Sequence, residues 1–204
     1  MANTLTFYTN PMSRGQIARW MLEEVGEPYE QVIVAYGEAM RAPDYLRLNP
    51  MGKVPTITHG PHIVTEAAAI CMYLADAFPQ AELAPPLEGR ANYYRWLLFA
   101  AGPLEQAIVN KSFGWEPDSP QAQGRLGFGS FDRTVGVLEQ WLTGRSYICN
   151  DRFSAADVYV GAMVDWGLKF KTLPALPAFE TYITPLRERA AYRRAKQIDA
   201  ELSR

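Results

Sequence analysis

The sequence predicts two domains of different class, an α/β domain at residues 1–78 and an all-helical domain at residues 89–204. In the first part of the chain, short β-rich runs alternate with runs of helical spacing. Three prolines then fall between Pro79 and Gly89, and this density is typical of a linker, which we place at 79–88. Beyond the linker, apolar residues recur at intervals of three and four, which indicates helices.

The elements of the first domain follow one another as strand, helix, strand, helix, two strands and helix. Gly26 marks the end of the first helix, and Gly60-Pro61 forms the turn of a hairpin. The order β-α-β-α-β-β-α resembles that of a thioredoxin-like domain. The predicted ranges are, in order, strand 4–8, helix 17–25, strand 29–36, an irregular helical stretch at 38–48, strands 54–58 and 62–64, and helix 70–77.

In the second domain, the run from Phe153 to Val158 marks a helix start. Ser154 is suited to cap this helix, Asp157 stands at its third position, and Phe153 can pack against Val158. We therefore expect a capping box with a structural role rather than a catalytic one. Pro103 predicts a kink or a break in an otherwise helical stretch.

The composition excludes several functional classes. Hydrophobic residues make up 48% of the chain and charged residues 21%, as in a soluble globular protein, and a net charge of −2 indicates no basic patch for nucleic acid. No apolar run reaches the roughly 18 residues of a membrane span, and the N-terminus lacks the basic and apolar regions of a signal peptide. We therefore expect a cytoplasmic protein without nucleic-acid or membrane partners.

The cysteine and histidine positions predict neither a redox pair nor a metal centre. Cys71 and Cys149 are far apart, and the chain contains no Cys-x-x-Cys motif, so dithiol chemistry is disfavoured. His59 and His62 flank a Gly-Pro turn and have no carboxylate cluster beside them, so we expect no bound metal.

The most informative segment runs from Asn49 to Ile57 and continues to a helix start at Glu66. Proline cannot donate to a sheet ladder, so Pro55 belongs at a strand start, an edge or a bulge. An X–Pro bond is cis at modest cost, and we expect a cis bond between Val54 and Pro55. The Val54 backbone would then face outward and pair with a short extended peptide. Because a helix N-terminus suits a carboxylate, the segment predicts a site for a small anionic peptide.

This pairing resembles the glutathione S-transferase family, which places a Val–cis-Pro on one strand and a Glu–Ser at the start of the next helix. Val54, Pro55 and Glu66 match that pattern. The resemblance implies that Val54 pairs with the cysteinyl backbone of glutathione, that Glu66 holds its γ-glutamyl end, and that Lys53 belongs to the same site. Ala67 stands where the family usually has serine, so the backbone N–H remains at this position but a hydroxyl contact worth roughly 1–3 kcal/mol is lost.

The resemblance also implies that a hydroxyl group activates the glutathione thiol, and two hydroxyls are candidates. Tyr8 ends the first predicted strand, where some members place a tyrosine, and Ser13 starts the first helix, where others place a serine. The Ser13-Arg14 pair after a proline favours Ser13, with Tyr8 second and Asn10 third. Lowering a thiol pKa from about 8.5 to about 6.5 requires roughly 2.7 kcal/mol. One charge-assisted hydrogen bond of about 1.5–3 kcal/mol, with a helix dipole of about 0.3–1 kcal/mol, suffices.

By this resemblance, the chain is expected to transfer glutathione to hydrophobic electrophiles, without a metal and as a homodimer. Another glutathione-dependent activity on the same fold stays open, namely isomerase, peroxidase or reductive dehalogenase, and so does a non-catalytic binding or regulatory module. In the family, the electrophile lies between the two domains. Six residues are candidates to line its site, or to belong instead to the core or the dimer surface: Met12, Tyr36, Trp96, Phe99, Phe113 and Trp115.

Overall fold

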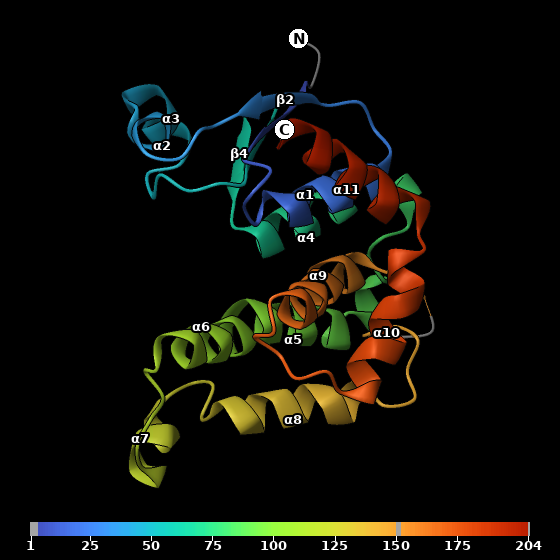
Figure 1. The fold of residues 1–204 in the computed structure, drawn as a ribbon. Coiled ribbons are helices and arrows are strands. Elements are labelled where there is room, and N and C mark those ends of the chain that lie inside the picture. Colours follow the sequence, from blue (N-terminus) through green and yellow to red (C-terminus); the bar gives the residue numbers. More distant parts are fainter. Residues whose placement is uncertain (1–3, 150–151, 204) are drawn as a thin grey trace. The chain divides into compact units, whose positions relative to one another are not determined.

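The computed structural model describes residues 4–149 and 152–203 (Figure 1). Its contacts divide the chain into two compact units, Met1–Leu83 with Glu188–Arg204, and Ala84–Arg187. The sequence pattern grouped the end of the chain with the helical domain, whereas the last helix, α11 (Ala190–Leu202), packs against α1 (Gly15–Val25) of the first unit. Amphipathic spacing identifies a helix but does not say which apolar surface that helix covers.

The first unit is built on a four-stranded sheet of order β2-β1-β3-β4. Strand β1 (Leu5–Thr9) pairs in parallel with β2 (Glu30–Ile33) and antiparallel with β3 (Thr56–His59). Strand β3 pairs antiparallel with β4 (His62–Thr65) across the predicted Gly-Pro turn, in which Gly60 has a φ of 57°. The predicted hairpin is confirmed, and β2 is shorter than the β-rich run at 29–36 because its partner β1 ends at Thr9, which pairs with Ile33.

Helices α1 and α4 (Ala67–Ala77) of the same unit contact each other and the sheet. Helix α1 ends at Gly26, whose φ of 77° is the left-handed conformation that glycine adopts readily at a helix end, as predicted. The irregular helical stretch consists of two short helices, α2 (Glu38–Arg41) and α3 (Pro43–Leu48). The element order confirms the predicted thioredoxin-like domain.

The two faces of β1 pack against different partners. Leu5, Phe7 and Thr9 are buried, while Tyr8 between them is half-buried, because successive side chains of a strand point to opposite faces. On its own face, Tyr8 packs against a small cluster formed by residues that follow β2. That cluster consists of Val34, Met40 and Tyr45, with Leu48 and Val54 packed against it.

The second unit consists of helices joined by loops, with no strand among its described residues, as predicted. Helix α9 (Ala155–Lys169) is almost wholly buried and contacts α5 and α10. None of the helices in the described part of the chain is both long and apolar enough to cross a bilayer. The other elements of the unit are η2 (Leu87–Gly89), α5 (Ala91–Phe99), η3 (Ala100–Leu104), α6 (Glu105–Phe113), α7 (Pro120–Arg125), α8 (Phe131–Leu142) and α10 (Pro177–Arg187).

The predicted irregularity at Pro103 takes the form of the π-helical turn η3, which joins α5 to α6 without interrupting the helical path. Proline lacks the N–H that an α-helix would require at this position. A π-turn shifts the hydrogen-bond pattern, so the chain remains helical on both sides of Pro103.

The predicted capping box at the start of α9 is present. The carboxylate of Asp157 accepts hydrogen bonds from the backbone N–H and the hydroxyl of Ser154, at 3.0 and 3.1 Å. It also accepts from the backbone N–H of Ile148 at 2.7 Å and from the hydroxyl of Tyr182 at 3.0 Å. Burial raises the pKa of Asp157 to about 6. Because its acceptors are used within the protein, we assign the box a structural role.

Candidate functional site

The register of the sheet brings the predicted site residues to one end of the first unit. Tyr8 pairs with Thr56 in the β1–β3 ladder, and Thr56 pairs with Thr65 in the β3–β4 ladder. The turn after β1, the residues before β3 and the residue after β4 therefore lie at the same end of the sheet. Val54 precedes Thr56 by two positions, and Glu66 follows Thr65 directly.

The Val54–Pro55 peptide bond is cis, as predicted. Pro55 is buried, and Val54 is half-buried against the cluster around Tyr45. Within the residues that the structure describes, the N–H and C=O of Val54 make no backbone hydrogen bond, and β3 begins only at Thr56. This geometry leaves one short stretch of extended backbone for pairing with a peptide.

Side chains from α3 and the following loop hold the residue before Val54 in place. The carbonyl of Lys53 accepts hydrogen bonds from the Tyr45 hydroxyl at 2.5 Å and from the Asn49 side-chain amide at 2.8 Å. Both donors also contact the hydroxyl of Thr56, at 3.1 and 3.3 Å. Tyr45, Asn49 and Thr56 are buried, whereas the Lys53 side chain is exposed. The loop is thus fixed from inside the protein.

Glu66 caps the N-terminus of α4 with a φ of 65°, which is uncommon for a residue other than glycine. Such residues cost about 1–3 kcal/mol and cluster at functional sites. The Glu66 side chain is exposed, and the first backbone N–H groups of α4 have no partner within the helix. Ala67, the first residue of α4, is buried. The helix start therefore presents N–H donors beside a carboxylate.

The turn between β1 and α1 is closed by its own side chains. Asn10 donates to the carbonyl of Val34 at 3.1 Å and accepts from the N–H of Met12 at 3.0 Å. The hydroxyl of Ser13 donates to the carbonyl of Asn10 at 2.7 Å and accepts from the N–H of Gly15 at 2.9 Å. To donate to a thiolate, the Ser13 hydroxyl has to rotate away from Asn10.

The second candidate hydroxyl, that of Tyr8, makes no hydrogen bond with any described residue. Its ring lies 6.0 Å from that of Tyr45, measured between centroids. Burial is the largest contribution that raises the pKa of Tyr45, and the nearby Tyr8 adds to it. Both Tyr8 and Ser13 thus stand at the site, but only Tyr8 has an uncommitted hydroxyl proton.

Sequence reasoning did not assign a role to Tyr45, Asn49 or Gln16, although each fixes a backbone carbonyl at the site. Gln16 donates to the carbonyl of Pro11 at 2.6 Å. The signal available in the sequence was weak, because one polar side chain in a short helix or loop does not reveal which distant carbonyl it reaches. Asn49, before the Pro50 turn, was the best placed to be found.

The candidates for contact with an electrophile separate into buried and exposed residues. Trp96 is fully buried in the second unit, where it packs against Phe99 and Trp141 at 5.0 Å, so it belongs to the core. Phe113 and Trp115 are exposed and stacked on each other with centroids 4.7 Å apart. In the first unit, Met12 and Tyr36 are exposed, and the Tyr36 hydroxyl donates to the carbonyl of Met12 at 3.1 Å.

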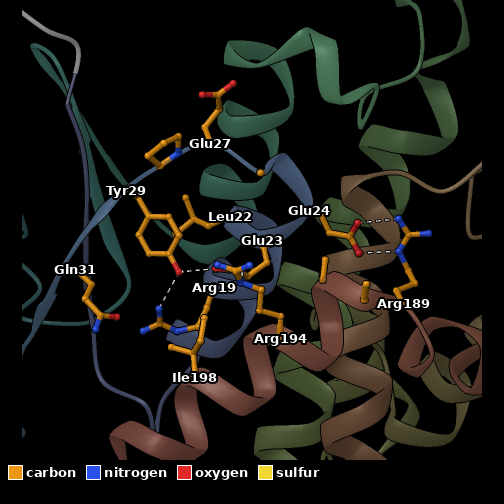
Figure 2. Close-up of a pocket in the computed structure, with 14 residues that line it drawn as sticks. Arg19, Leu22, Glu23, Glu24, Glu27, Tyr29, Gln31, Arg189, Arg194 and Ile198 are labelled. Atoms are coloured by element: carbon orange, nitrogen blue, oxygen red, sulfur yellow. Dashed lines mark hydrogen bonds and ion pairs between the residues drawn. The ribbon is translucent and has the colours of Figure 1, made fainter.

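A concave region of the first unit lies between α1, α11 and the start of β2 (Figure 2). This cleft has a volume of about 1020 Å³, and two pairs of its charged side chains, Glu24 with Arg189 and Glu23 with Arg194, bind each other. Glu24 forms two hydrogen bonds with Arg189, at 2.6 and 2.7 Å. Tyr29 accepts from Arg19 at 3.0 Å and donates to Glu23 at 2.7 Å, and burial is the main cause that raises the pKa of Tyr29 to about 12. The paired charges make this cleft a junction between helices.

Comparison with known proteins shows which family this chain resembles. The model of the glutathione S-transferase N-terminal domain matches residues 3–76. The chain is 30% identical over 151 residues to a probable glutathione S-transferase of Oryza sativa subsp. japonica, covering 68% of each protein. It is 28% identical over 185 residues to the glutathione S-transferase GST-4.5 of Xanthomonas campestris, covering 86% of this chain and 90% of that protein.

Solved structures give the same result. The structure of a sphingomonad glutathione S-transferase complexed with glutathione is 28% identical, with a TM-score of 0.75 and coverage of 96% of this chain and 98% of that one. The glutathione transferase URE2P6 of Phanerochaete chrysosporium, in complex with oxidised glutathione, is 25% identical, with a TM-score of 0.78 and coverage of 98% of each chain.

Proposed function

Because this chain belongs to the glutathione S-transferase family, we propose that it conjugates glutathione, through its sulfur, to hydrophobic electrophiles. The observation that carries the proposal is the pairing of an unengaged Val54 backbone with the helix start at Glu66, beside the turn that holds Ser13. These groups lie at one end of the sheet, where one small peptide can meet all of them.

In the proposed complex, the N–H and C=O of Val54 pair with the cysteinyl residue of glutathione. The γ-glutamyl end lies at the start of α4, where Glu66 binds its amino group and the N–H of Ala67 binds its carboxylate. Lys53, whose side chain is exposed, is placed to attract the second carboxylate of the peptide. The contacts with Val54 align the peptide along the extended backbone, and the contact with Glu66 supplies most of the recognition of the charged amino group.

The thiol of bound glutathione then has to lose its proton. We propose the Ser13 hydroxyl as the donor that stabilises the thiolate, with the Tyr8 hydroxyl as the alternative. Ser13 is supported by its position at the start of α1, where the helix dipole also favours a negative charge. Tyr8 is supported by its uncommitted proton. The thiolate attacks an electrophilic carbon, a carbon–sulfur bond forms, and the electron pair passes to a leaving group or to an adjacent atom.

Calorimetric titration with glutathione, followed by an assay with an activated aryl halide, tests this function. We expect saturable binding and formation of a thioether product. Binding without turnover of any electrophile would instead indicate a non-catalytic binding module. No binding at millimolar glutathione would contradict both functions.

We further propose that the protein is a cytoplasmic homodimer. Its two cysteines are both free and buried, which suits a reducing compartment. Two-fold dimers are the commonest oligomers of soluble proteins. Analytical ultracentrifugation at micromolar concentration measures the mass directly, and sedimentation as a single 22.9 kDa chain would contradict the dimer.

A further inference from the structure

Three consecutive backbone carbonyls in the β1–α1 turn each accept a hydrogen bond from a side chain. Asn10, Pro11 and Ser13 are buried, and a buried carbonyl needs a hydrogen-bond partner, so these side chains fix the turn from within the protein. The pairs are, in order, Ser13 Oγ to Asn10 O at 2.7 Å, Gln16 Nε2 to Pro11 O at 2.6 Å, and Tyr36 Oη to Met12 O at 3.1 Å.

The middle pair is connected to the end of the chain. Lys196, on α11, donates from Nζ to the side-chain oxygen of Gln16 at 3.0 Å. A glutamine amide has a donor end and an acceptor end, whereas an ammonium group only donates. Lys196 therefore holds the amide oxygen of Gln16 towards itself and leaves the NH₂ group facing the carbonyl of Pro11. The reversed amide would set NH₂ against NH₃⁺ and two carbonyl oxygens against each other.

Helix α11 is attached to α1 by other pairs that do not involve Lys196. Arg19, fully buried on α1, bonds to Asp199 on α11 at 2.7 Å. Arg189, just before α11, bonds to Glu24, and Arg194 on α11 lies 2.7 Å from Glu23 (Figure 2). The helix therefore remains docked when Lys196 is replaced.

We propose that Gln16 and Lys196 are positioning residues that hold the thiol-activating turn in register. Neither residue needs to touch glutathione. Gln16 fixes the carbonyl of Pro11, two positions before Ser13, and Lys196 fixes the direction of the Gln16 amide. This inference rests on the proposed function, because it concerns the same reacting sulfur. It adds that the C-terminal helix contributes to activity from outside the binding groups.

Loss of either positioning residue should lower the rate of the chemical step more than the affinity for glutathione. Misplacement of a reacting group by about 1 Å can cost up to about 100-fold in rate. The groups proposed to bind glutathione, at Val54 and Glu66, are not bonded to Gln16 or Lys196. We therefore expect the Michaelis constant for glutathione to stay within about twofold, while kcat falls about tenfold. The pKa of the bound thiol should rise by about 0.5–1 unit.

Four variants separate positioning from stability. Lys196→Met removes the ammonium and keeps the apolar stem, and Lys196→Arg restores a donor to Gln16. Gln16→Glu keeps the pair with Lys196 but turns an oxygen towards the carbonyl of Pro11. Gln197→Ala is the matched control, because Gln197 is the next residue of α11 and its side chain bonds, among the described residues, only to the exposed Glu201. The pKa of bound glutathione is read from thiolate absorbance, and urea midpoints report folding.

We expect Lys196→Met and Gln16→Glu to raise the thiol pKa, Lys196→Arg to return it towards the wild-type value, and Gln197→Ala to leave it unchanged. If wild type lowers the thiol pKa and neither Lys196→Met nor Gln16→Glu changes it, the positioning role is wrong and the proposed function stands. If urea midpoints fall while the thiol pKa holds, the two residues serve folding only. If wild type itself does not lower the thiol pKa, the proposed function fails and the positioning role fails with it.

Discussion

The capping box of α9 and the loop before β3 are both buried polar networks, but they end differently. At the box, four donors meet the Asp157 carboxylate, which is fully buried. At the loop, two donors meet the carbonyl of Lys53, and the next residue, Val54, keeps its backbone groups free of backbone partners in the described chain. A network that satisfies all its members stabilises a fold. A network that holds the loop rigid but leaves the backbone N–H and C=O of Val54 without backbone partners keeps those groups available for a ligand.

The largest effect should come from breaking the satisfied network. Asp157→Ala leaves the Ile148 N–H and the Tyr182 hydroxyl without their acceptor, and each unsatisfied buried group costs about 1–3 kcal/mol. We expect the free energy of unfolding to fall by about 3–5 kcal/mol in urea titrations. Asp132, in the first turn of α8, is an exposed aspartate for comparison, and Asp132→Ala should change stability by less than about 0.5 kcal/mol. Equal effects at the two positions would refute the contrast between the networks.

The same residue makes the stability of the protein depend on pH. Burial raises the pKa of Asp157 to about 6 in the folded state, above the roughly 3.9 of an unfolded aspartate. The folded state therefore binds this proton more tightly, so its contribution to stability is complete below pH 4 and is lost as the pH rises through 6. Relative to Asp157→Asn, wild type should lose roughly 2–3 kcal/mol between pH 4 and pH 7. Unfolding curves of both proteins across this range measure the difference, and a constant difference would contradict the raised pKa.

At the proposed glutathione site, a substitution should change binding rather than stability. Glu66→Ala removes a charged hydrogen-bonding group from the proposed γ-glutamyl site, and we expect glutathione binding to weaken by about 1.5–3 kcal/mol. Because the Glu66 side chain is exposed and makes no hydrogen bond with a described residue, the urea midpoint should hardly move. Ala67→Ser restores the hydroxyl that the family usually carries, and binding should stay equal or improve. Calorimetry with unchanged affinity in Glu66→Ala would place the glutathione site elsewhere.

Local rules explain which features could be predicted from the sequence. The turn at Gly60-Pro61, the helix end at Gly26 and the capping box each depend on a few adjacent residues, and all three are confirmed. The placement of α11 depends instead on Arg19 and Asp199, which are 180 positions apart. No local pattern links residues at that separation, so the last helix was assigned to the wrong unit.

The same reasoning applies to side chains at the site. Val54, Pro55 and Glu66 could be identified because they form a short sequence motif whose residue types are visible in the chain itself. Tyr45 matters through one carbonyl that the folded loop brings within 2.5 Å, which a single sequence does not reveal. Trp96 was a candidate for ligand contact because it is aromatic, but aromatic residues are also the largest core residues. It is fully buried among other rings.

The two candidate hydroxyls, those of Ser13 and Tyr8, are distinguished by removing each one in turn. Ser13→Ala and Tyr8→Phe each remove one hydroxyl and little volume. Loss of the hydroxyl that bonds the thiolate should raise the pKa of bound glutathione by about one to two units, since roughly 1.5–3 kcal/mol of charge-assisted bonding disappears. We expect the pKa of bound glutathione to rise in Ser13→Ala, because Ser13 stands at the start of α1. In Tyr8→Phe it should stay unchanged. Ultraviolet absorbance of the thiolate, titrated with pH, measures both. The opposite result would assign activation to Tyr8, whose proton has no partner among the described residues, and leave Ser13 as a local turn residue that closes on Asn10. If neither variant shifts the pKa, either the backbone N–H groups and the dipole of α1 hold the thiolate, or the protein does not activate glutathione at all.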